Sequence, residues 1–275
     1  MKGKLYVMAT PLGNLGDLSV RAAEVLQSVD VVAAEDTRRS RTLLQHVGAR
    51  PRVVSYHAHS SASRTDELLE TLQVGGSVAL LTDAGTPAVS DPGSDLVRRA
   101  RAADIEVVAV PGPSAVAAAL SVAGLPADRF TFFGFLPRKG GERTRLLRAI
   151  AGSPWTVVVF EAPPRLVRLL EDLAEVCGGD RHVVVARELT KLHEEVRAGT
   201  LEELEGYYRE ARVKGEITLV ISSAPVEPNV VSEEEIRARA RELLKEGMSR
   251  RDVAAWLAEE LDVSRKETYR VVTSL

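Results

Sequence analysis

Short apolar runs alternate along the chain with longer segments in which apolar residues recur every three or four positions. The runs are typical of buried strands and the longer segments of amphipathic helices, so their alternation predicts a parallel sheet with crossover helices. The strands expected in the first half are Leu5–Ala9, Asp30–Ala34, Arg52–Tyr56, Ser77–Thr82 and Glu106–Val110. The helices expected between them are Ser19–Gln27, Arg39–His46, Ser63–Gln73 and Ser94–Ala103.

A second alternation begins after the Pro-Gly-Pro break at 111–113, where an alanine-rich helix starts. Its expected strands, which we assign to a second, mixed sheet, are Arg129–Phe135, Thr156–Phe160, His182–Ala186 and Glu216–Ser222. The expected helices are Arg143–Ala149, Pro164–Val176 and Leu201–Arg212.

The last part of the chain is charged and has a helical pattern. It follows Ala224–Asn229, whose two prolines and lack of periodicity predict a linker. Two short helices are expected at Arg250–Leu261 and Arg265–Thr273, joined by Asp262-Val263, with Ser249 and Ser264 in N-cap patterns. The expected domains are therefore 1–112, 113–225 and 230–275.

Composition narrows the class of protein. The 275 residues are 45% hydrophobic, enough for two compact cores. The 36 Lys and Arg nearly balance 39 Asp and Glu, so a polyanionic partner would need a local basic surface. Cys177 is the single cysteine, which excludes an intramolecular disulfide and a cysteine-rich zinc site. Because neither a signal-peptide core nor a membrane-length apolar run is present, we expect a cytoplasmic protein.

The run TDAGTPAVSDPG, Thr82–Gly93, is the clearest candidate for a ligand site. Its glycines and prolines restrict a loop and let backbone approach a ligand closely. It follows the fourth expected strand, and ligands of parallel sheets bind beyond the carboxyl ends of strands. The turn VPGPSA repeats this arrangement after the fifth strand, where Ser114 is either a ligand contact or a simple N-cap.

Two residue groups leave alternatives open. Glu35 and Asp36 lie about twenty residues after the first loop, where a nicotinamide enzyme keeps its ribose-binding acid. However, the spacing Gly13-x-x-Gly16 is neither a dinucleotide fingerprint nor a P-loop. Asp36 and Thr37 also fit a helix cap, and the acids also suit a substrate cleft.

Histidines and basic residues form the other group. His57 and His59 are spaced for a metal, but no matching set completes such a site, so a substrate contact by His57 is favoured. Arg138, Lys139, Arg143 and Arg145 form a glycine-hinged loop that either binds phosphates or is simply solvated.

Taken in order, the segments TPLGNLGD, AEDTR, SYHAH, TDAGTPAVSDPG, VPGPSA, FFGFLPR, FEAPPR, RELTKLHEE and KGEITLVI resemble the ribosomal small subunit methyltransferase I family. The resemblance covers about residues 3 to 223, and the tail resembles that family's helical domain. It implies an α/β, tetrapyrrole methylase-like two-domain fold: a parallel-sheet N-terminal domain, a mixed-sheet second domain and a small, all-helical, helix-turn-helix-like C-terminal tail. It also implies transfer of a methyl group from S-adenosyl-L-methionine to a cytidine 2′-hydroxyl of 16S rRNA in the small ribosomal subunit, with no metal.

The resemblance also implies site residues. The expected cofactor contacts are Leu12, Asp83, Ala84, Gly85, Thr86, Pro87, Ala88, Val89, Ser114, Ala115, Phe160, Ala186 and Glu216. The first loop lacks the glycine pattern of porphyrin methylators, which argues against a tetrapyrrole substrate. Candidates for orienting or deprotonating the hydroxyl are Asp36, Glu188 and Lys191. Candidates for RNA contact are Arg38, His57, Arg138, Lys139, Arg187, Arg265 and Lys266.

The assembly state of the protein and its function have further interpretations. A homodimer is expected, and the charge-balanced tail serves either RNA binding or a dimer or packing contact. An NAD-dependent oxidoreductase, a methyltransferase of the same fold with another substrate, and a non-enzymatic ribosome assembly factor are the alternative functions.

Overall fold

Five apolar segments of the first half pair side by side, all parallel, in the order β3-β2-β4-β1-β5. They are β1 Lys4–Met8, β2 Val31–Ala34, β3 Arg52–Ser55, β4 Val78–Leu81 and β5 Glu106–Val110. Every residue of β2 and β4 is buried, as expected for central strands covered on both faces. Helices α1 Val20–Ser28 and α2 Thr37–His46 pack on one face, and α3 Ala62–Gln73 and α4 Ser94–Ala102 on the other.

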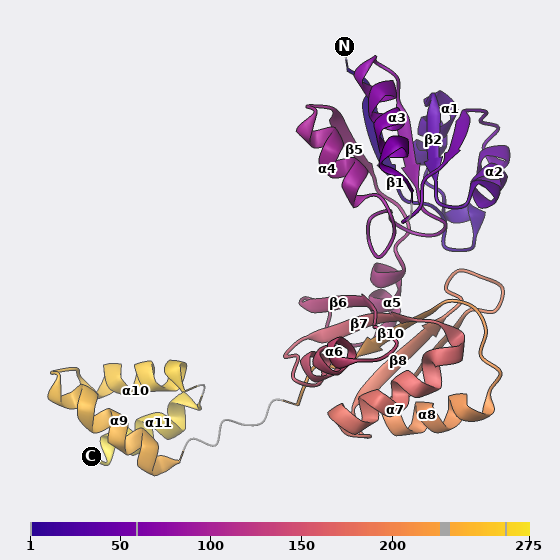
Figure 1. Cartoon of the computed structure of the whole chain (residues 1–275). Helices are drawn as coiled ribbons and strands as arrows, with labels where there is room; N and C mark the ends of the chain where they lie inside the picture. The colour runs from indigo at the N-terminus through magenta and orange to yellow at the C-terminus, as the bar shows by residue number, and fades with distance from the viewer. Residues whose placement is uncertain (1, 59, 226–231, 262) are drawn as a thin grey trace. The chain divides into compact units, whose positions relative to one another are not determined.

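The computed structural model describes residues 2–58, 60–225, 232–261 and 263–275. The chain divides into two compact units, Met1–Ala224 and Pro225–Leu275 (Figure 1). The first unit holds both sheets. The predicted limits 1–112, 113–225 and 230–275 stay predictions.

The second sheet has the order β6-β7-β10-β8-β9. Its strands are β6 Phe130–Phe135, β7 Thr156–Glu161, β8 His182–Arg187, β9 Glu195–Thr200 and β10 Ile217–Ile221. Only the β6–β7 pair is parallel, which confirms the predicted mixed sheet. Helix α5 Ala115–Ala123 packs on one face, while α6 Gly141–Ala151, α7 Leu166–Cys177 and α8 Leu201–Glu210 pack on the other.

Two elements had no counterpart in the sequence prediction. Strand β9 lies at the edge of its sheet, and its EVRAGT sequence has too few apolar residues to signal a strand. Helix α9 Glu233–Lys245 precedes α10 Arg250–Glu260 and α11 Arg265–Thr273 and is dominated by charged residues. Their apolar positions form one small core of the second unit.

The predicted caps and connections of the tail had mixed outcomes. The Ser249 hydroxyl accepts a hydrogen bond from Asp252 N, as a capping residue does, but Ser264 stands at the N-cap without a side-chain capping bond. Most of the predicted linker, residues 226–229, and Asp262 of the predicted turn lie outside the described residues, as does His59. Within the described ranges, no helix is long and apolar enough to cross a membrane.

Arg143 corrects one prediction about the basic loop. Its side chain is buried rather than available to phosphate: Nε and Nη2 donate to Asp172 Oδ2 at 2.9 and 2.6 Å, and Nη1 donates to the Pro137 carbonyl at 2.9 Å. Arg168 lies 2.8 Å from the other Asp172 oxygen. The Arg143–Asp172 ion pair therefore joins α6 to α7, the two helices that pack side by side on the second sheet.

Replacing Asp172 by alanine is expected to lower the free energy of unfolding by about 3–5 kcal/mol, because the buried Arg143 guanidinium loses its partner. Chemical denaturation measures the change. Glu175→Ala, at an exposed position of the same helix, is the matched control. Equal effects of the two substitutions would contradict the assignment of this pair as a structural link.

Candidate active site

The loops that follow β1 and β4 are joined directly at the carboxyl edge of the parallel sheet. Thr10 N donates to the Gly85 carbonyl at 2.8 Å, and Gly85 N donates to the Thr10 carbonyl at 3.0 Å. The Thr10 hydroxyl also donates to the Thr82 carbonyl at 3.1 Å. Gly85 has φ +82°, a left-handed conformation that favours glycine. The chain thus turns immediately after Thr82 and Asp83 and directs both side chains to the sheet edge.

A cavity of about 430 Å³ lies against this joint, within the size range of small-molecule sites. Residues from both sheets line it: Leu12, Glu35, Arg39, Asp83, Ala84, Gly85, Thr86, Val89, Ser90, Asp91, Ser114, Ala115, Val116, Phe135, Phe160, Glu161, Ala162, Pro163, Gly215, Glu216, Ile217 and Thr218. We call it the large cavity. Its carboxylates outnumber the Arg39 guanidinium, so its electrostatics favour a ligand that carries positive charge.

A second cavity of about 360 Å³, the small cavity, adjoins the first. It is lined by the first loop from Thr10, by α2 residues, by Thr82, and by Lys191. The two cavities share Leu12, Arg39, Asp83 and Glu216. Two reactants placed in them would meet at this shared boundary.

The start of helix α5 gives the large cavity a site for an anionic group. Ser114 occupies the N-cap position, but its hydroxyl makes no capping bond, and Ser114, Ala115 and Val116 line the cavity. Unpaired amides at a helix N-terminus attract carboxylate or phosphate. The Thr86 hydroxyl donates to the Pro113 carbonyl at 3.2 Å and so fixes this turn to the β4 loop.

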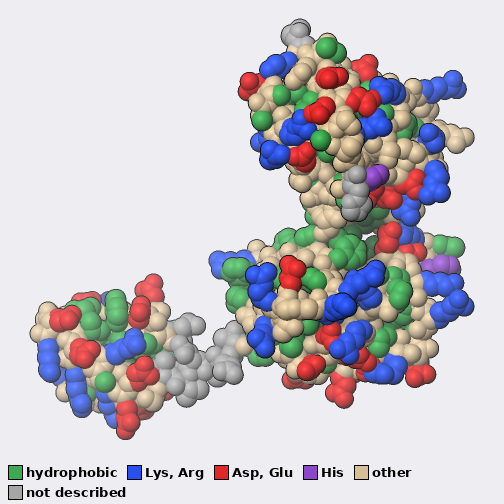
Figure 2. Space-filling model, in the orientation of Figure 1, with side chains coloured by type: hydrophobic (Ala, Val, Ile, Leu, Met, Phe, Trp, Pro, Cys, Tyr) green, Lys and Arg blue, Asp and Glu red, His purple; other side chains and the backbone are tan. Residues whose placement is uncertain are grey.

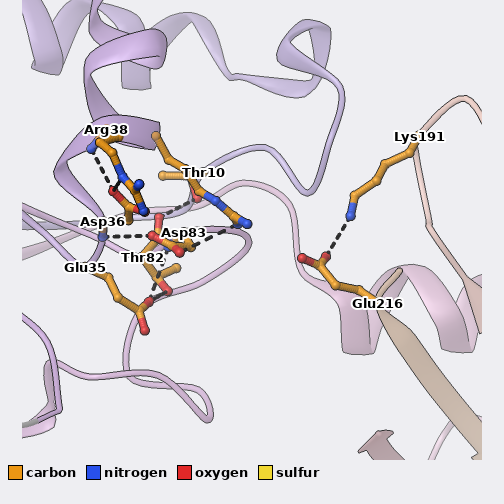
Figure 3. A network of polar contacts seen from close by, with 9 residues as sticks. Thr10, Glu35, Asp36, Arg38, Thr82, Asp83, Lys191 and Glu216 are labelled. Carbon is orange, nitrogen blue, oxygen red and sulfur yellow. Dashed lines mark hydrogen bonds and ion pairs between the residues drawn. The ribbon is translucent and has the colours of Figure 1, made fainter. Parts of the chain in front are cut away.

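A polar network surrounds the end of β4 (Figure 3). The Thr82 hydroxyl donates to Glu35 Oε2 at 2.8 Å, and Asp36 N donates to Asp83 Oδ1 at 2.9 Å. Arg39 lies 3.6 Å from the other Asp83 oxygen. The loops after β2 and β4 are therefore held together by their own carboxylates.

The second half contributes Lys191 from the loop between β8 and β9. Lys191 Nζ lies 3.1 Å from Glu216 Oε2 (Figure 3). It also lies 2.8 Å from Glu188 Oε1, and Glu216 N donates to Glu188 Oε1 at 3.0 Å. The Lys191 stem packs directly on Gly13, where a Cβ atom would lie only 2.2 Å from Lys191 Cγ. This close approach explains the glycine, and it brings the first loop against the second half.

The pKa values separate the carboxylates into two groups. Hydrogen bonds from Arg38 lower the Asp36 pKa to about 2, and bonds from Lys191 and from Glu216 N outweigh burial and lower the Glu188 pKa. Lys191 has a raised pKa, because its bonds to the Glu188 and Glu216 carboxylates outweigh the effect of burial. In contrast, burial raises the Asp91 pKa to about 6, and the charges of Glu35, Asp83 and Glu216 add to it.

Glu161 is the most deeply buried carboxylate of the large cavity. Its Oε1 accepts a hydrogen bond from Ala162 N at 2.8 Å and lies 3.0 Å from Arg165 Nε. Glu161 Oε2 has no hydrogen-bond partner among the described residues, and burial raises the pKa of the Glu161 carboxyl. This oxygen is therefore available to accept a hydrogen bond from a ligand in the large cavity.

The structure brings together most of the predicted cofactor contacts. Those that line the large cavity are Leu12, Asp83, Ala84, Gly85, Thr86, Val89, Ser114, Ala115, Phe160 and Glu216. Pro87, Ala88 and Ala186 do not line it; Ala186 is buried in β8, paired with Thr218 of the cavity wall. Sequence reasoning did not select Asp91, although it lies in the Thr82–Gly93 run, nor Glu161, which stands directly after Phe160.

The predicted catalytic and RNA-contact residues are more dispersed. Lys191 lines the small cavity, whereas Asp36 caps α2 and Glu188 holds Lys191, and neither lines a cavity. Arg187 is paired with Glu195 at 2.9 Å. The remaining predicted RNA contacts have exposed side chains: Arg38, His57, Arg138, Lys139, Arg265 and Lys266.

The nicotinamide hypothesis is not favoured by this geometry. The usual dinucleotide-binding sheet has the order 3-2-1-4-5, whereas here β4 lies between β2 and β1. Glu35 also accepts the Thr82 hydroxyl bond and lines the large cavity. Among the described residues, no group of three or more His, Cys, Asp or Glu is arranged to hold a metal.

Comparison with known proteins identifies the family to which this architecture is similar. The profile of the tetrapyrrole (corrin/porphyrin) methylases matches residues 4–205. Two proteins named ribosomal RNA small subunit methyltransferase I are similar over nearly the whole chain. The one from Synechocystis sp. is 46% identical over 99% of this chain and 98% of its own length, and the one from Escherichia coli O157:H7 is 42% identical over 98% and 94%.

Solved structures show the same fold at low sequence identity. A cobalt precorrin-4 methyltransferase superposes with a TM-score of 0.61 at 20% identity, covering 80% of this chain and 94% of its own. The uroporphyrin-III C-methyl transferase from Thermus thermophilus, complexed with S-adenosyl homocysteine, gives 0.58 at 22% identity, covering 79% and 97%. These similarities confirm the predicted fold class.

The Asp91 carboxyl is expected to titrate at about pH 6, which carboxyl ¹³C NMR measures directly. Between about pH 4 and pH 6 the folded state holds a proton that the unfolded state has released, so stability falls as pH rises through this window. Asp91→Asn removes this dependence and therefore gains stability relative to the unsubstituted protein as pH rises. Asp36 is the internal reference, since its pKa of about 2 keeps its resonance constant there. An Asp91 resonance that titrates near 4 would contradict the assignment.

Proposed function

We propose that this chain, a member of the tetrapyrrole (corrin/porphyrin) methylases, methylates the 2′-hydroxyl of a cytidine in 16S rRNA with S-adenosyl-L-methionine as methyl donor. Within the methylases it belongs to the ribosomal RNA small subunit methyltransferase I family. The observation that carries the proposal is the pair of adjoining cavities with a common boundary at Leu12, Arg39, Asp83 and Glu216. The large cavity is assigned to the cofactor, and the small cavity to the nucleotide.

The residues of the large cavity fit this cofactor. Its excess of carboxylates suits a sulfonium cation, and the amides at the start of α5 suit the cofactor carboxylate. The unpaired Glu161 Oε2 offers an acceptor for a cofactor amine or hydroxyl. Leu12, Phe160 and Ile217 supply apolar walls for the remaining surface. Ala186 pairs with the wall residue Thr218 in the sheet, and Pro87 and Ala88 lie in the chain between the wall residues Thr86 and Val89.

The protein's part in the reaction is mainly one of position. When bound, S-adenosyl-L-methionine supplies the methyl group. The chain then holds the ribose hydroxyl near the shared boundary, and such positioning accounts for a large part of the rate. Lys191, kept protonated by Glu188 and Glu216, is suited to orient the hydroxyl or a neighbouring phosphate. Asp36, as the cap of α2, is suited to orient Arg38.

RNA contact is assigned to basic side chains that follow or end strands of the first unit and to two on the second unit. Arg38 follows β2 and is 86% exposed, and Arg138 and Lys139 follow β6. His57 follows β3, Arg187 ends β8, and Arg265 and Lys266 begin α11. Figure 2 shows basic side chains intermixed with acidic ones over the visible face, which favours several separate phosphate contacts over one basic patch. Because duplex RNA hides its bases, the target cytidine is expected in a loop or splayed strand.

The proposal includes a cytoplasmic location, where small ribosomal subunits assemble, and a homodimer. Light scattering coupled to gel filtration tests the dimer.

Incubation with radiolabelled S-adenosyl-L-methionine and small ribosomal subunits, followed by nucleoside mapping, tests the function. The expected product is a single 2′-O-methylated cytidine. Label on a base would contradict the proposed hydroxyl acceptor, and label on a tetrapyrrole would favour the other substrate class of this fold. RNA binding without transfer would favour a non-enzymatic assembly factor.

Gly85→Ala is expected to weaken binding of S-adenosylhomocysteine, measured by calorimetry, because the Thr10–Gly85 joint forms a wall of the large cavity. An alanine at φ +82° costs about 1–2 kcal/mol, which opens the joint. Gly124→Ala is the matched control, since Gly124 also has positive φ (+66°) but lies at the end of α5 with open space around it. The control should lose similar stability and keep the affinity. Equal losses of affinity would contradict the role of the joint.

A further inference from the structure

One stretch of the first half carries positive charge without any acid. Residues 37–65 contain none of the 39 Asp and Glu of the chain, and they contain six arginines: Arg38, Arg39, Arg41, Arg50, Arg52 and Arg64. The stretch includes α2, the turn that follows it, and β3. Since the charges of the whole chain nearly balance, this stretch supplies the local basic surface that a polyanionic partner needs.

A third cavity, of about 370 Å³, lies beside α2 within this stretch. Arg41 and Arg50 line it, and their guanidinium groups have no hydrogen-bond or ion-pair partner in the part of the chain that the structure describes. In contrast, Arg52 and Arg64 are both paired with Glu67. Two guanidinium groups that lack a carboxylate partner at one cavity favour an anionic ligand, and phosphate suits their geometry.

The remaining walls of the third cavity suit a nucleobase. Four of its lining residues are apolar: Leu44, Ala49, Pro51 and Val53. The exposed Gln45 adds a side-chain amide, which both donates and accepts hydrogen bonds. Unstacked RNA bases bind to such sites by packing on apolar or guanidinium surfaces and by hydrogen bonds at their edges. The volume also matches the small cavity, at about 360 Å³, so both cavities have the size for one nucleotide.

Helix α2 lies between the small cavity and the third cavity. Successive helix residues are about 100° apart, so Arg39 and Leu43, which line the small cavity, share one flank of α2. Arg41 and Gln45, which line the third cavity, share the opposite flank. The exposed face between the two flanks carries Arg38. Because a helix is about 10–12 Å wide with its side chains, an RNA strand that crosses this face connects the two cavities within a few nucleotides.

We propose, resting on the function above, that the third cavity binds a second nucleotide of the substrate RNA, a near neighbour of the target cytidine on the same strand. The target occupies the small cavity, and the strand crosses the exposed face of α2 beside Arg38. The base of the neighbour enters the third cavity against its apolar walls and the Gln45 amide, while Arg41 and Arg50 bind its phosphates. The protein therefore recognises two unstacked nucleotides, one on each flank of α2.

The arginines are tested by equilibrium binding of the full-length protein, with S-adenosylhomocysteine present, to small ribosomal subunits over a range of salt concentrations. Arg41→Ala and Arg50→Ala are each expected to lower the slope of log affinity against log salt by about 0.7, which corresponds to roughly fivefold weaker binding at about 0.1 M salt. Arg101→Ala is the matched control, because Arg101 is exposed on α4, on the other face of the sheet. It should leave the affinity and the slope unchanged.

The bound base is tested by Gln45→Ala in the same assay. Loss of a neutral hydrogen bond to the base is expected to weaken binding roughly two- to tenfold without changing the salt slope. Gln73→Ala, exposed at the end of α3, is the matched control and should bind as the unsubstituted protein does.

The position of the second nucleotide is tested by crosslinking. Gln45→Cys, labelled with an azidophenacyl group and irradiated on small ribosomal subunits, should crosslink 16S rRNA within a few nucleotides of the methylated cytidine, as mapped by reverse transcription. Gln73→Cys with the same label should not crosslink there. Cys177 is present in both variants, so any label on it affects them equally.

Three outcomes overturn the proposal. Arginine variants that bind as Arg101→Ala does exclude a phosphate contact at the third cavity. A Gln45→Ala variant with full affinity excludes a bound base. A crosslink far from the methylated cytidine excludes a near neighbour. The proposed function fails separately: if these substitutions weaken binding but the unsubstituted protein methylates no cytidine hydroxyl, the function is wrong and the third cavity still binds RNA.

Discussion

The joint between Thr10 and Gly85 is the constraint on which the site depends. Parallel strands β1 and β4 are neighbours in the sheet, so their following loops leave the same edge, and two backbone hydrogen bonds lock them together. Because Gly85 turns the chain immediately after β4, Thr82 and Asp83 cannot continue the strand and instead face the junction of the cavities. The bonds of Thr82 to Glu35 and of Asp83 to Asp36 N depend on where this turn lies.

Asp36 and Asp91 show how neighbours determine the role of one residue type. Asp36 stands at a helix N-terminus beside Arg38, where amide and guanidinium donors stabilise its charge. Asp91 stands half-buried among other carboxylates, where charge is unfavourable. The first environment makes a permanent anion suited to orientation, and the second makes a group that exchanges a proton near neutral pH. Sequence reasoning selected Asp36 because its place after β2 was visible, whereas the crowding around Asp91 exists only in the folded chain.

The difference between local sequence signals and contacts made only in the folded chain also explains which other features could be predicted from the sequence. Periodicity located the central strands and their helices, because burial on both faces leaves continuous apolar runs such as β2 and β4. Glycine and proline density located the Thr82–Gly93 wall. Edge strand β9 was missed because it needs few apolar residues, and Arg143 was misassigned because its partner Asp172 lies on another helix. Pairings across elements, such as Thr82 with Glu35, have no local signature.

Loops of both halves shape the site through backbone conformations that are unfavourable in isolation. Glu188 and Thr190 beside Lys191, and Ala88 and Ser90 beside Asp91, all have positive φ without being glycine. Each such residue costs of order 1–3 kcal/mol and persists only where the surroundings hold it. Here the surroundings are the contacts between the halves, Lys191 on Gly13 and Ser90 on Gly134. The strained loops and the contacts that hold them surround the two cavities, so folding energy is spent to fix the boundary at which the reactants meet.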